Sequence, residues 1–119
     1  MQVTHSLREL APATVVDFKG EIDMSNSPEV RKILRSLTKE KKKLLVVNLA
    51  QVKYVDSSGI ATLLDCLKEV RKYKGTFRLS GLSGSILDVF RLARLESVFE
   101  IFPDAAAAAG AAVPAGGAK

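Results

Sequence analysis

The sequence predicts an α/β protein with a mixed β-sheet of about four to five strands and helices packed against it. Two observations lead to this prediction. Short apolar segments of strand length alternate with segments whose apolar residues recur at helical spacing, which is typical of parallel strands joined by helices. The first two strands instead follow each other across a short turn at Ala11-Pro12, so they are predicted to be antiparallel and to make the sheet mixed.

The first half of the chain is predicted to form a hairpin and then a helix. Residues 3–10 and 13–18 are the two strands of the hairpin. Ser27 is predicted to cap the helix, because a serine oxygen accepts hydrogen bonds from free N–H groups, and Pro28 suits the first helical position. Apolar residues at helical spacing carry this helix to about Thr38.

The second half continues the alternation of strand and helix. Residues 44–49 form an almost continuous apolar run, as expected for a strand covered on both faces. A second helix is predicted from residues 57–58 to about Tyr73, with Gly75 as its stop. The remaining predicted elements are a strand at 76–80, a third helix opening within 81–85, and a final strand or short helix at 98–102.

The chain is predicted to divide into one domain, residues 1–104, and an alanine- and glycine-rich tail, residues 105–119. Its 119 residues fit a single domain. Asp104 can cap the run of alanines, but Gly110 and Pro114 interrupt it. Since isolated helices shorter than roughly 12–15 residues are marginal in water, we expect this tail to be frayed or disordered.

Composition and charge favour a cytoplasmic protein. No apolar run approaches the roughly 20 residues of a membrane span, so no membrane insertion is expected, and the N-terminal residues lack the features of a secretory signal. A single cysteine, Cys66, excludes an internal disulfide and fits a reducing compartment. Much of the net charge of +5 comes from residues 39–43, which we interpret as a solvated connection. With no tryptophan and few aromatic residues, direct binding of nucleic acid is not expected.

The most informative segment is Asp56-Ser57-Ser58-Gly59, which lies between an apolar strand and a helix. The start of a helix offers free N–H groups and a partial positive charge, so a phosphate on Ser57 would find a favourable site. A structural interpretation is also open, in which Asp and Ser only cap the helix and Gly59 allows a close approach of two chain segments.

Catalysis is not expected of this chain. Its only histidine, His5, lies in the first strand with no reason to approach Ser57, and a nucleophilic serine needs an activating base. One cysteine and one histidine are too few for a thiolate or imidazole metal site. We therefore predict no enzyme, no metal and no cofactor.

Five segments of the chain form a recognisable set: Gly20-Glu21-Ile22-Asp23, Leu45-Val46-Val47-Asn48-Leu49, Asp56-Ser57-Ser58-Gly59-Ile60, the stretch from Ser80 to Phe90, and Leu95-Glu96-Ser97-Val98-Phe99. Through these segments the sequence resembles, over about residues 3–102, the STAS-domain anti-sigma factor antagonists. They occur in the family's order and at compatible spacing. The resemblance implies the STAS fold, with the serine turn as the loop that a partner kinase phosphorylates.

The resemblance also implies roles for individual residues. Ser57 is the phosphoacceptor, and Ser58 and Gly59 complete and support the loop. The two acids Asp23 and Asp56 flank the site, where they would position the Ser57 hydroxyl or contact the kinase, unless Asp56 only stabilises the turn. Asp65, on the exposed side of the second helix, is expected to contact the partner.

The function implied is that of a switch. The unphosphorylated protein would bind an ATP-dependent serine kinase that is also the anti-sigma factor, and so release the sigma factor; phosphorylation of Ser57 would block binding, and a serine phosphatase would reset it. The alternative is a STAS scaffold subunit of an ABC lipid transporter that docks on its ATPase without phosphorylation. A basic nucleic-acid adaptor is a third possibility, which a steep salt dependence of binding would reveal.

Overall fold

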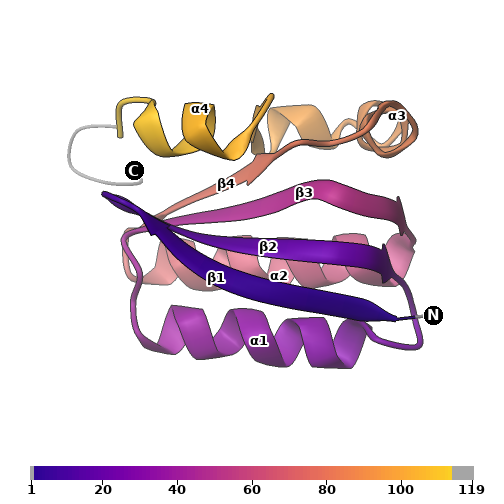
Figure 1. Ribbon diagram of the computed structural model, residues 1–119, viewed down its shortest axis with the longest axis horizontal. Coiled ribbons are helices and arrows are strands. Elements are labelled where there is room, and N and C mark those ends of the chain that lie inside the picture. Colours follow the sequence, from indigo (N-terminus) through magenta and orange to yellow (C-terminus); the bar gives the residue numbers. More distant parts are fainter. Residues whose placement is uncertain (1, 114–119) are drawn as a thin grey trace.

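The computed structural model describes residues 2–113, and these form a five-stranded sheet combined with helices (Figure 1). The strand order is β1-β2-β3-β4-β5, with β1 antiparallel to β2 and every other neighbouring pair parallel. The strands are β1 (Val3–Leu10), β2 (Ala13–Ile22), β3 (Leu44–Val55), β4 (Thr76–Ser80) and β5 (Glu100–Phe102). The helices are α1 (Ser27–Lys39), α2 (Ser57–Lys72), α3 (Gly84–Leu92) and α4 (Ala105–Gly110), with a 3₁₀ turn at Leu95–Ser97. The predicted mixed sheet is confirmed.

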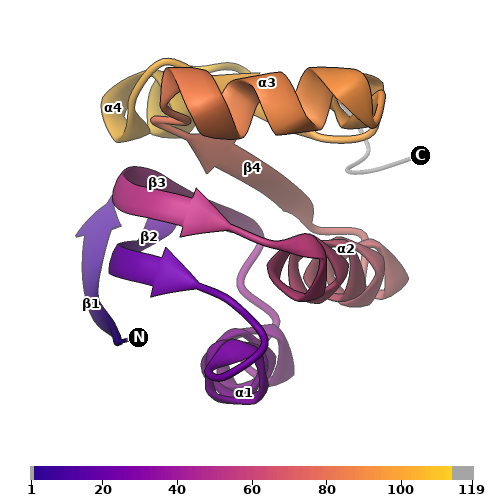
Figure 2. The ribbon, with the colours of Figure 1, turned by 90° about the vertical axis from the view of Figure 1, so that its right-hand side faces the viewer.

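The sheet is covered from two sides. Figure 2 shows α1 and α2 on one side and α3 and α4 together on the other. Consecutive residues in the middle of the sheet are therefore buried, as Val15 and Val16 in β2 and Val46 and Val47 in β3 illustrate. No helix within residues 2–113 is both long and apolar enough to cross a membrane.

β2 and β3 both run further than the sequence predicted, to Ile22 and Val55, and the end of β3 is irregular. Relative to β2, it carries one extra residue between Asn48 and Gln51 and another between Val52 and Tyr54. Such bulges shift the alternation of side chains between the two faces. As a result β3 buries every third residue beyond Asn48, a pattern that the alternation rule for strands does not detect.

Gly20 allows the N-terminal segment to run close along the end of β2. Its φ is +114°, and a Cβ atom at this position would lie 2.2 Å from the Gln2 carbonyl oxygen. Only glycine adopts this backbone without strain and without that clash. The resulting path leads β2 to its end at Ile22, directly before the loop that enters α1.

Helix α1 begins one residue earlier than predicted. Asn26 occupies the N-cap position and Ser27 is the first helical residue, followed by Pro28. The Asn26 side chain does not cap the helix, but accepts a hydrogen bond from Asp23 N at 3.0 Å and donates one to Glu21 O at 2.8 Å. It therefore holds the loop between β2 and α1 in shape.

The structure differs from the expectation of a frayed or disordered segment over residues 105–110, which are helical. Ala105–Gly110 form α4, and Asp104 caps it by accepting a hydrogen bond from Ala107 N at 2.8 Å. The helix is stable because it packs on the sheet, where it buries Ala105, Ala108 and Ala109 in a second, smaller core. Residues 114–119, the remainder of the predicted tail, lie outside the described part of the chain.

Candidate functional site

The candidate site lies at the carboxyl ends of β2 and β3, where the chain enters α1 and α2. Binding sites of open α/β sheets are commonly found beyond this edge. Two hydrogen bonds join the loops that leave the two strands: Asp56 N donates to Ile22 O at 3.1 Å, and Met24 N donates to the Asp56 carboxylate at 3.0 Å. The predicted site residues of the two loops are thus brought to one surface.

Asp56 is the residue that caps α2. One carboxylate oxygen accepts hydrogen bonds from Ser58 N at 2.9 Å and from Gly59 N at 3.1 Å, two N–H groups that the helix itself leaves without a partner. The same oxygen accepts the Ser58 hydroxyl at 2.6 Å. Asp56 therefore stabilises the turn, the structural role that the sequence left open for it.

The donors around Asp56 also set its ionisation. The hydrogen bond from the Ser58 hydroxyl, helped by the N–H groups of Gly59, Met24 and Ser58, lowers the pKa of Asp56 below its usual value. The carboxylate is consequently ionised at neutral pH, as a helix N-terminus favours.

This lowered pKa predicts how the site responds to acid. A carboxylate with a depressed pKa in the folded state adds stability that is present above its unfolded pKa and is lost as pH falls through its folded pKa. Asn is an equally good helix cap but cannot ionise. We expect the urea midpoint of the wild type to fall more steeply between about pH 5 and pH 2 than that of Asp56→Asn. If the urea midpoints of the two proteins fell in parallel with pH, ionisation of Asp56 would not contribute to the acid sensitivity of the fold.

Ser57 does not take part in capping α2, unlike its neighbours Asp56 and Ser58. It is the first residue of α2 and is exposed, and its hydroxyl makes no hydrogen bond within residues 2–113. Ser58, in contrast, is partly buried, with its hydroxyl bonded to Asp56 and its carbonyl oxygen accepting the Thr62 hydroxyl at 2.9 Å. The structure of the turn therefore explains why Asp and Ser occupy positions 56 and 58, but it does not explain why a serine occupies position 57.

Gly59 is required by packing. A Cβ atom at this position would lie 2.7 Å from Val55 Cγ1 and 2.9 Å from Ile22 Cγ2. The first turn of α2 therefore rests directly on the ends of β2 and β3. This close approach holds Ser57 at a fixed position relative to the sheet.

Asp23 shapes the other loop. Its carboxylate accepts hydrogen bonds from the backbone N–H and the hydroxyl of Ser25, and its carbonyl oxygen accepts Ser27 N at 2.8 Å. Like Asp56, it is engaged in its own turn and makes no hydrogen bond to Ser57 in the described chain. Both acids thus contribute by fixing the loops that surround Ser57.

Asp65 links the two helices on its side of the sheet. Its carboxylate lies 3.3 Å from Arg35 Nη2 and 4.0 Å from Arg31 Nε, both in α1, and its side chain is 30% exposed. Exposed ion pairs of this kind contribute roughly 0–1 kcal/mol. The ion pairs with α1 are enough to explain why residue 65 is an acid. The expected contact between Asp65 and a partner protein is therefore not needed to explain this residue.

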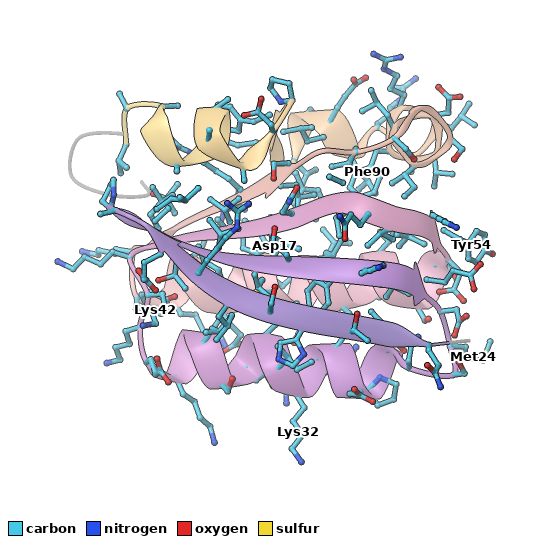
Figure 3. The ribbon with its side chains drawn as sticks, in the orientation of Figure 1. Asp17, Met24, Lys32, Lys42, Tyr54 and Phe90 are labelled. Carbon is cyan, nitrogen blue, oxygen red and sulfur yellow. The ribbon has the colours of Figure 1, made fainter. Side chains whose placement is uncertain are left out.

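Two apolar side chains that the sequence did not single out lie beside the serine turn. Met24 is 77% exposed and Tyr54 is 50% exposed. Figure 3 shows both at the same end of the molecule, where β2 and β3 finish. Exposed Met and Tyr are typical of protein interfaces. No signal in the sequence identifies them, because exposure depends on what the rest of the chain packs around each residue.

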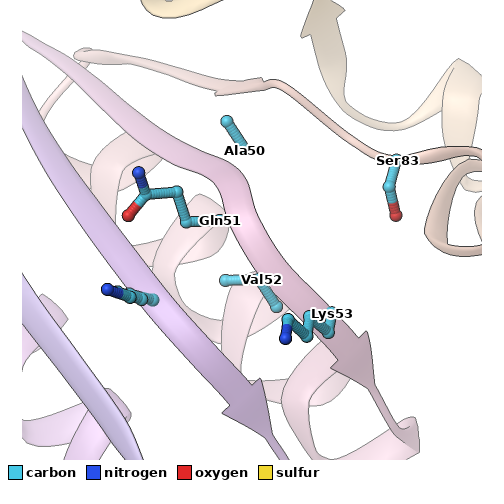
Figure 4. Close-up of a pocket in the computed structure, with 6 residues that line it drawn as sticks. Ala50, Gln51, Val52, Lys53 and Ser83 are labelled. Carbon is cyan, nitrogen blue, oxygen red and sulfur yellow. The ribbon is translucent and has the colours of Figure 1, made fainter.

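A separate groove of about 480 Å³ runs beside the bulges of β3 (Figure 4). Its lining residues are Lys19, Ala50, Gln51, Val52, Lys53 and Ser83. None of the predicted site residues lines it. Within residues 2–113 there is also no cluster of three His, Cys, Asp or Glu side chains that could hold a metal ion.

Comparison with known proteins identifies the family of this chain and agrees with its fold. The family model of the STAS domain matches residues 5–108. The anti-sigma-B factor antagonist of Bacillus subtilis is 30% identical over 86 residues, covering 72% of this chain and 78% of the relative. A crystal structure of an anti-sigma factor antagonist from Mycobacterium paratuberculosis superposes with a TM-score of 0.82 at 22% identity, covering 90% of this chain and 91% of the other. The Bacillus cell fate determinant SpoIIAA in its phosphorylated form gives a TM-score of 0.64 at 19% identity, covering 82% and 90% of the two chains. The chain belongs to the STAS domain family.

Proposed function

We propose that this protein is an anti-sigma factor antagonist that acts in the cytoplasm as a binding switch controlled by phosphorylation of Ser57. In its unphosphorylated form it binds an anti-sigma factor that is also an ATP-dependent serine kinase, and this binding frees the sigma factor. A serine phosphatase returns the modified protein to its binding form. The chain itself contributes no catalytic group.

The observation that carries the proposal is that the residues of the serine turn have different structural roles. Asp56 caps α2 and Ser58 supports that cap, while Ser57 is exposed and its hydroxyl makes no hydrogen bond in the described part of the chain. A kinase can therefore modify the Ser57 hydroxyl without breaking a contact of the fold. The relatives named as anti-sigma-B factor antagonists support the choice of partner class.

The surface around Ser57 also suits a reversible interface. Met24 and Tyr54 offer apolar contact area next to a small neutral hydroxyl. Asp23, Asp56, Ser58 and Gly59 hold this surface in one arrangement, so little ordering is needed on binding. Asp65 would contribute at the edge of the contact, where α2 continues.

The proposal is tested by capture from the native host with the wild type, Ser57→Ala and Ser58→Ala. We expect all three to retain a small ATP-dependent kinase, because the unmodified turn is its docking surface. When ATP and Mg²⁺ are added, mass spectrometry should find phosphate at position 57 in the wild type and in Ser58→Ala, and none in Ser57→Ala.

Two results would contradict the proposal. Phosphate transfer to Ser58 or to another serine would assign the switch to a different residue. Capture of transporter ATPase and permease subunits, with no phosphate transfer to any variant, would favour the STAS scaffold of an ABC transporter.

A further inference from the structure

The outer edge of the sheet at β1 is an unused pairing surface. β1 forms backbone hydrogen bonds to β2 on one side, and on its other side no strand of residues 2–113 follows. Residues 4–9 are all exposed, and β1 is the nearest element to the viewer in Figure 1, with nothing crossing in front of it. An open strand edge is a template for pairing with another chain.

Natural proteins often protect such an edge with lysine, proline or a bulge, and these three features are missing from β1. The strand is eight residues long, contains neither lysine nor proline, and pairs with β2 in one continuous register without a bulge. Its arginine, Arg8, is held on the neighbouring strand by Asp17, whose carboxylate lies 2.7 Å from Arg8 Nε. The edge is therefore long, regular and accessible.

The hydrogen bonds of the hairpin decide which residues of β1 face outward. Glu21 N donates to Gln2 O, so residue 2 belongs to a hydrogen-bonded pair of the antiparallel ladder. Because such pairs alternate along the ladder, the even-numbered residues of β1 direct their backbone groups to β2. His5, Leu7 and Glu9 consequently direct their N–H and C=O groups away from the sheet, where a further strand would bind them.

We propose that two copies of this chain pair edge to edge through β1, antiparallel, with the two-fold axis at Leu7. In this register Leu7 lies opposite Leu7 of the second copy, and His5 lies opposite Glu9 of the second copy. The two leucines, each 52% exposed in the single chain, cover one another. The imidazole can donate a hydrogen bond to the glutamate in either protonation state.

The side-chain positions in the single chain are consistent with this register. His5 packs against Phe18, with ring centroids 6.2 Å apart, and Glu9 accepts the Thr14 hydroxyl at 3.0 Å. Both residues are thereby held on the same face of the sheet, as an antiparallel cross-strand pair requires. Moving the axis to Arg8 would place two arginines opposite each other, and moving it to Ser6 would place Glu9 opposite Val3.

The dimer would leave both serine turns free. The site lies at the carboxyl end of β2, next to the beginning of β1 at Val3, which pairs with Gly20. Antiparallel pairing of the two β1 strands places the two sites at opposite ends of the joined sheet. One dimer could therefore engage two partner molecules, and this inference holds whatever the partner is.

Disulfide trapping tests both the dimer and its register. In the proposed pairing the Cα atoms of residue 7 in the two copies are about 5.5 Å apart, which a disulfide spans. The two copies of residue 6 are offset by two positions along the strands and lie more than about 7 Å apart, beyond disulfide reach. Under mild oxidation we expect Leu7→Cys to form a covalent dimer, and Ser6→Cys, which is also exposed, to remain largely monomeric.

The native cysteine provides the background control. Cys66 is 3% exposed and burial raises its pKa to about 12, so the wild type should not cross-link. Equal cross-linking of the two variants would indicate random collision and overturn the proposal. Cross-linking of Ser6→Cys alone would overturn the register.

A second measurement does not depend on cysteine chemistry. Sedimentation of the wild type should show a mass that rises with concentration towards the dimer, and Leu7→Lys should weaken association roughly tenfold or more, because it places two like charges opposite each other. Leu92→Lys, at an 86% exposed apolar site on α3, is the matched control and should associate as the wild type does. Circular dichroism verifies that both variants are folded. A monomeric wild type at every concentration would overturn the proposal.

Discussion

Phosphorylation of Ser57 is expected to weaken binding of the partner about a thousandfold, equivalent to about 4 kcal/mol. A phosphate adds about −1.5 to −2 charges and three acceptor oxygens at neutral pH. On the partner-free protein this charge lies at the start of α2, where the helix dipole favours it. In the complex it would have to be buried next to Met24 and Tyr54, and burying a charge without a counter-charge is costly.

The fold is expected to survive this modification, so the effect is one of exclusion. Ser57 has no hydrogen-bond partner to lose within residues 2–113, and the cap at Asp56 does not involve its hydroxyl. Circular dichroism and the urea midpoint should therefore be nearly unchanged. A large conformational change on phosphorylation would contradict this explanation.

Calorimetric titration with the captured partner measures the effect. The forms to compare are the unmodified protein, Ser57→Ala, and the protein carrying phosphoserine at position 57. The matched control carries phosphoserine at position 85, which is exposed in the first turn of α3 and so places the same charge at another helix start. We expect full affinity for this control. An equal loss of affinity with phosphate at position 57 or at position 85 would show a general effect of charge, and would contradict a switch specific to Ser57.

Replacement of Arg78 is expected to destabilise the fold by about 3 kcal/mol or more, although the residue lies outside the candidate site. Arg78 is only 1% exposed and lies in β4 beneath α4. Its guanidinium donates to the carbonyl oxygens of Ala108 at 2.8 Å, Ala111 at 2.9 Å and Ala112 at 2.7 Å. It also pairs with Glu100 at 2.9 Å, so one side chain binds the end of α4 to two strands.

The carbonyl groups at the end of a helix have no partner within the helix, and Arg78 supplies one. Arg78→Ala would leave the buried Ala108 carbonyl oxygen without this hydrogen bond and open a cavity next to the small core of alanines. Arg78→Lys keeps the charge but lacks the forked donors, so its loss of stability should be intermediate.

Urea unfolding of these variants, with hydrogen exchange of the amides in residues 105–111, gives the measurement. Glu100→Gln is the matched control, since Glu100 is 47% exposed and the ion pair alone should contribute about 1 kcal/mol or less. We expect Arg78→Ala to lower the midpoint strongly and to remove exchange protection from α4 first. An unchanged midpoint would mean that α4 is held by its alanines alone.

The sequence by itself determined the order of the strands and of helices α1, α2 and α3, the mixed sheet and the position of the serine turn. Each depends on local chemistry: apolar periodicity, the start of a helix at Asp56, and the glycine that permits close packing at Gly59. It also indicated Ser57 through resemblance to a family. It did not show whether Ser57 was a cap or a free hydroxyl, because either serine of the pair can cap a helix.

Only the tertiary structure decided the remaining features. The end of β3 was missed because its two bulges change the burial pattern from every second to every third residue, and bulges depend on pairing with β2. Helix α4 was missed because six residues with little intrinsic stability are held by contacts with distant parts of the chain, among them the hydrogen bonds of Arg78. Met24 and Tyr54 share one surface only because the folded sheet places the ends of β2 and β3 side by side. Features that depend on residues close in sequence can be predicted from the sequence, whereas those that depend on contacts between distant segments require the folded chain.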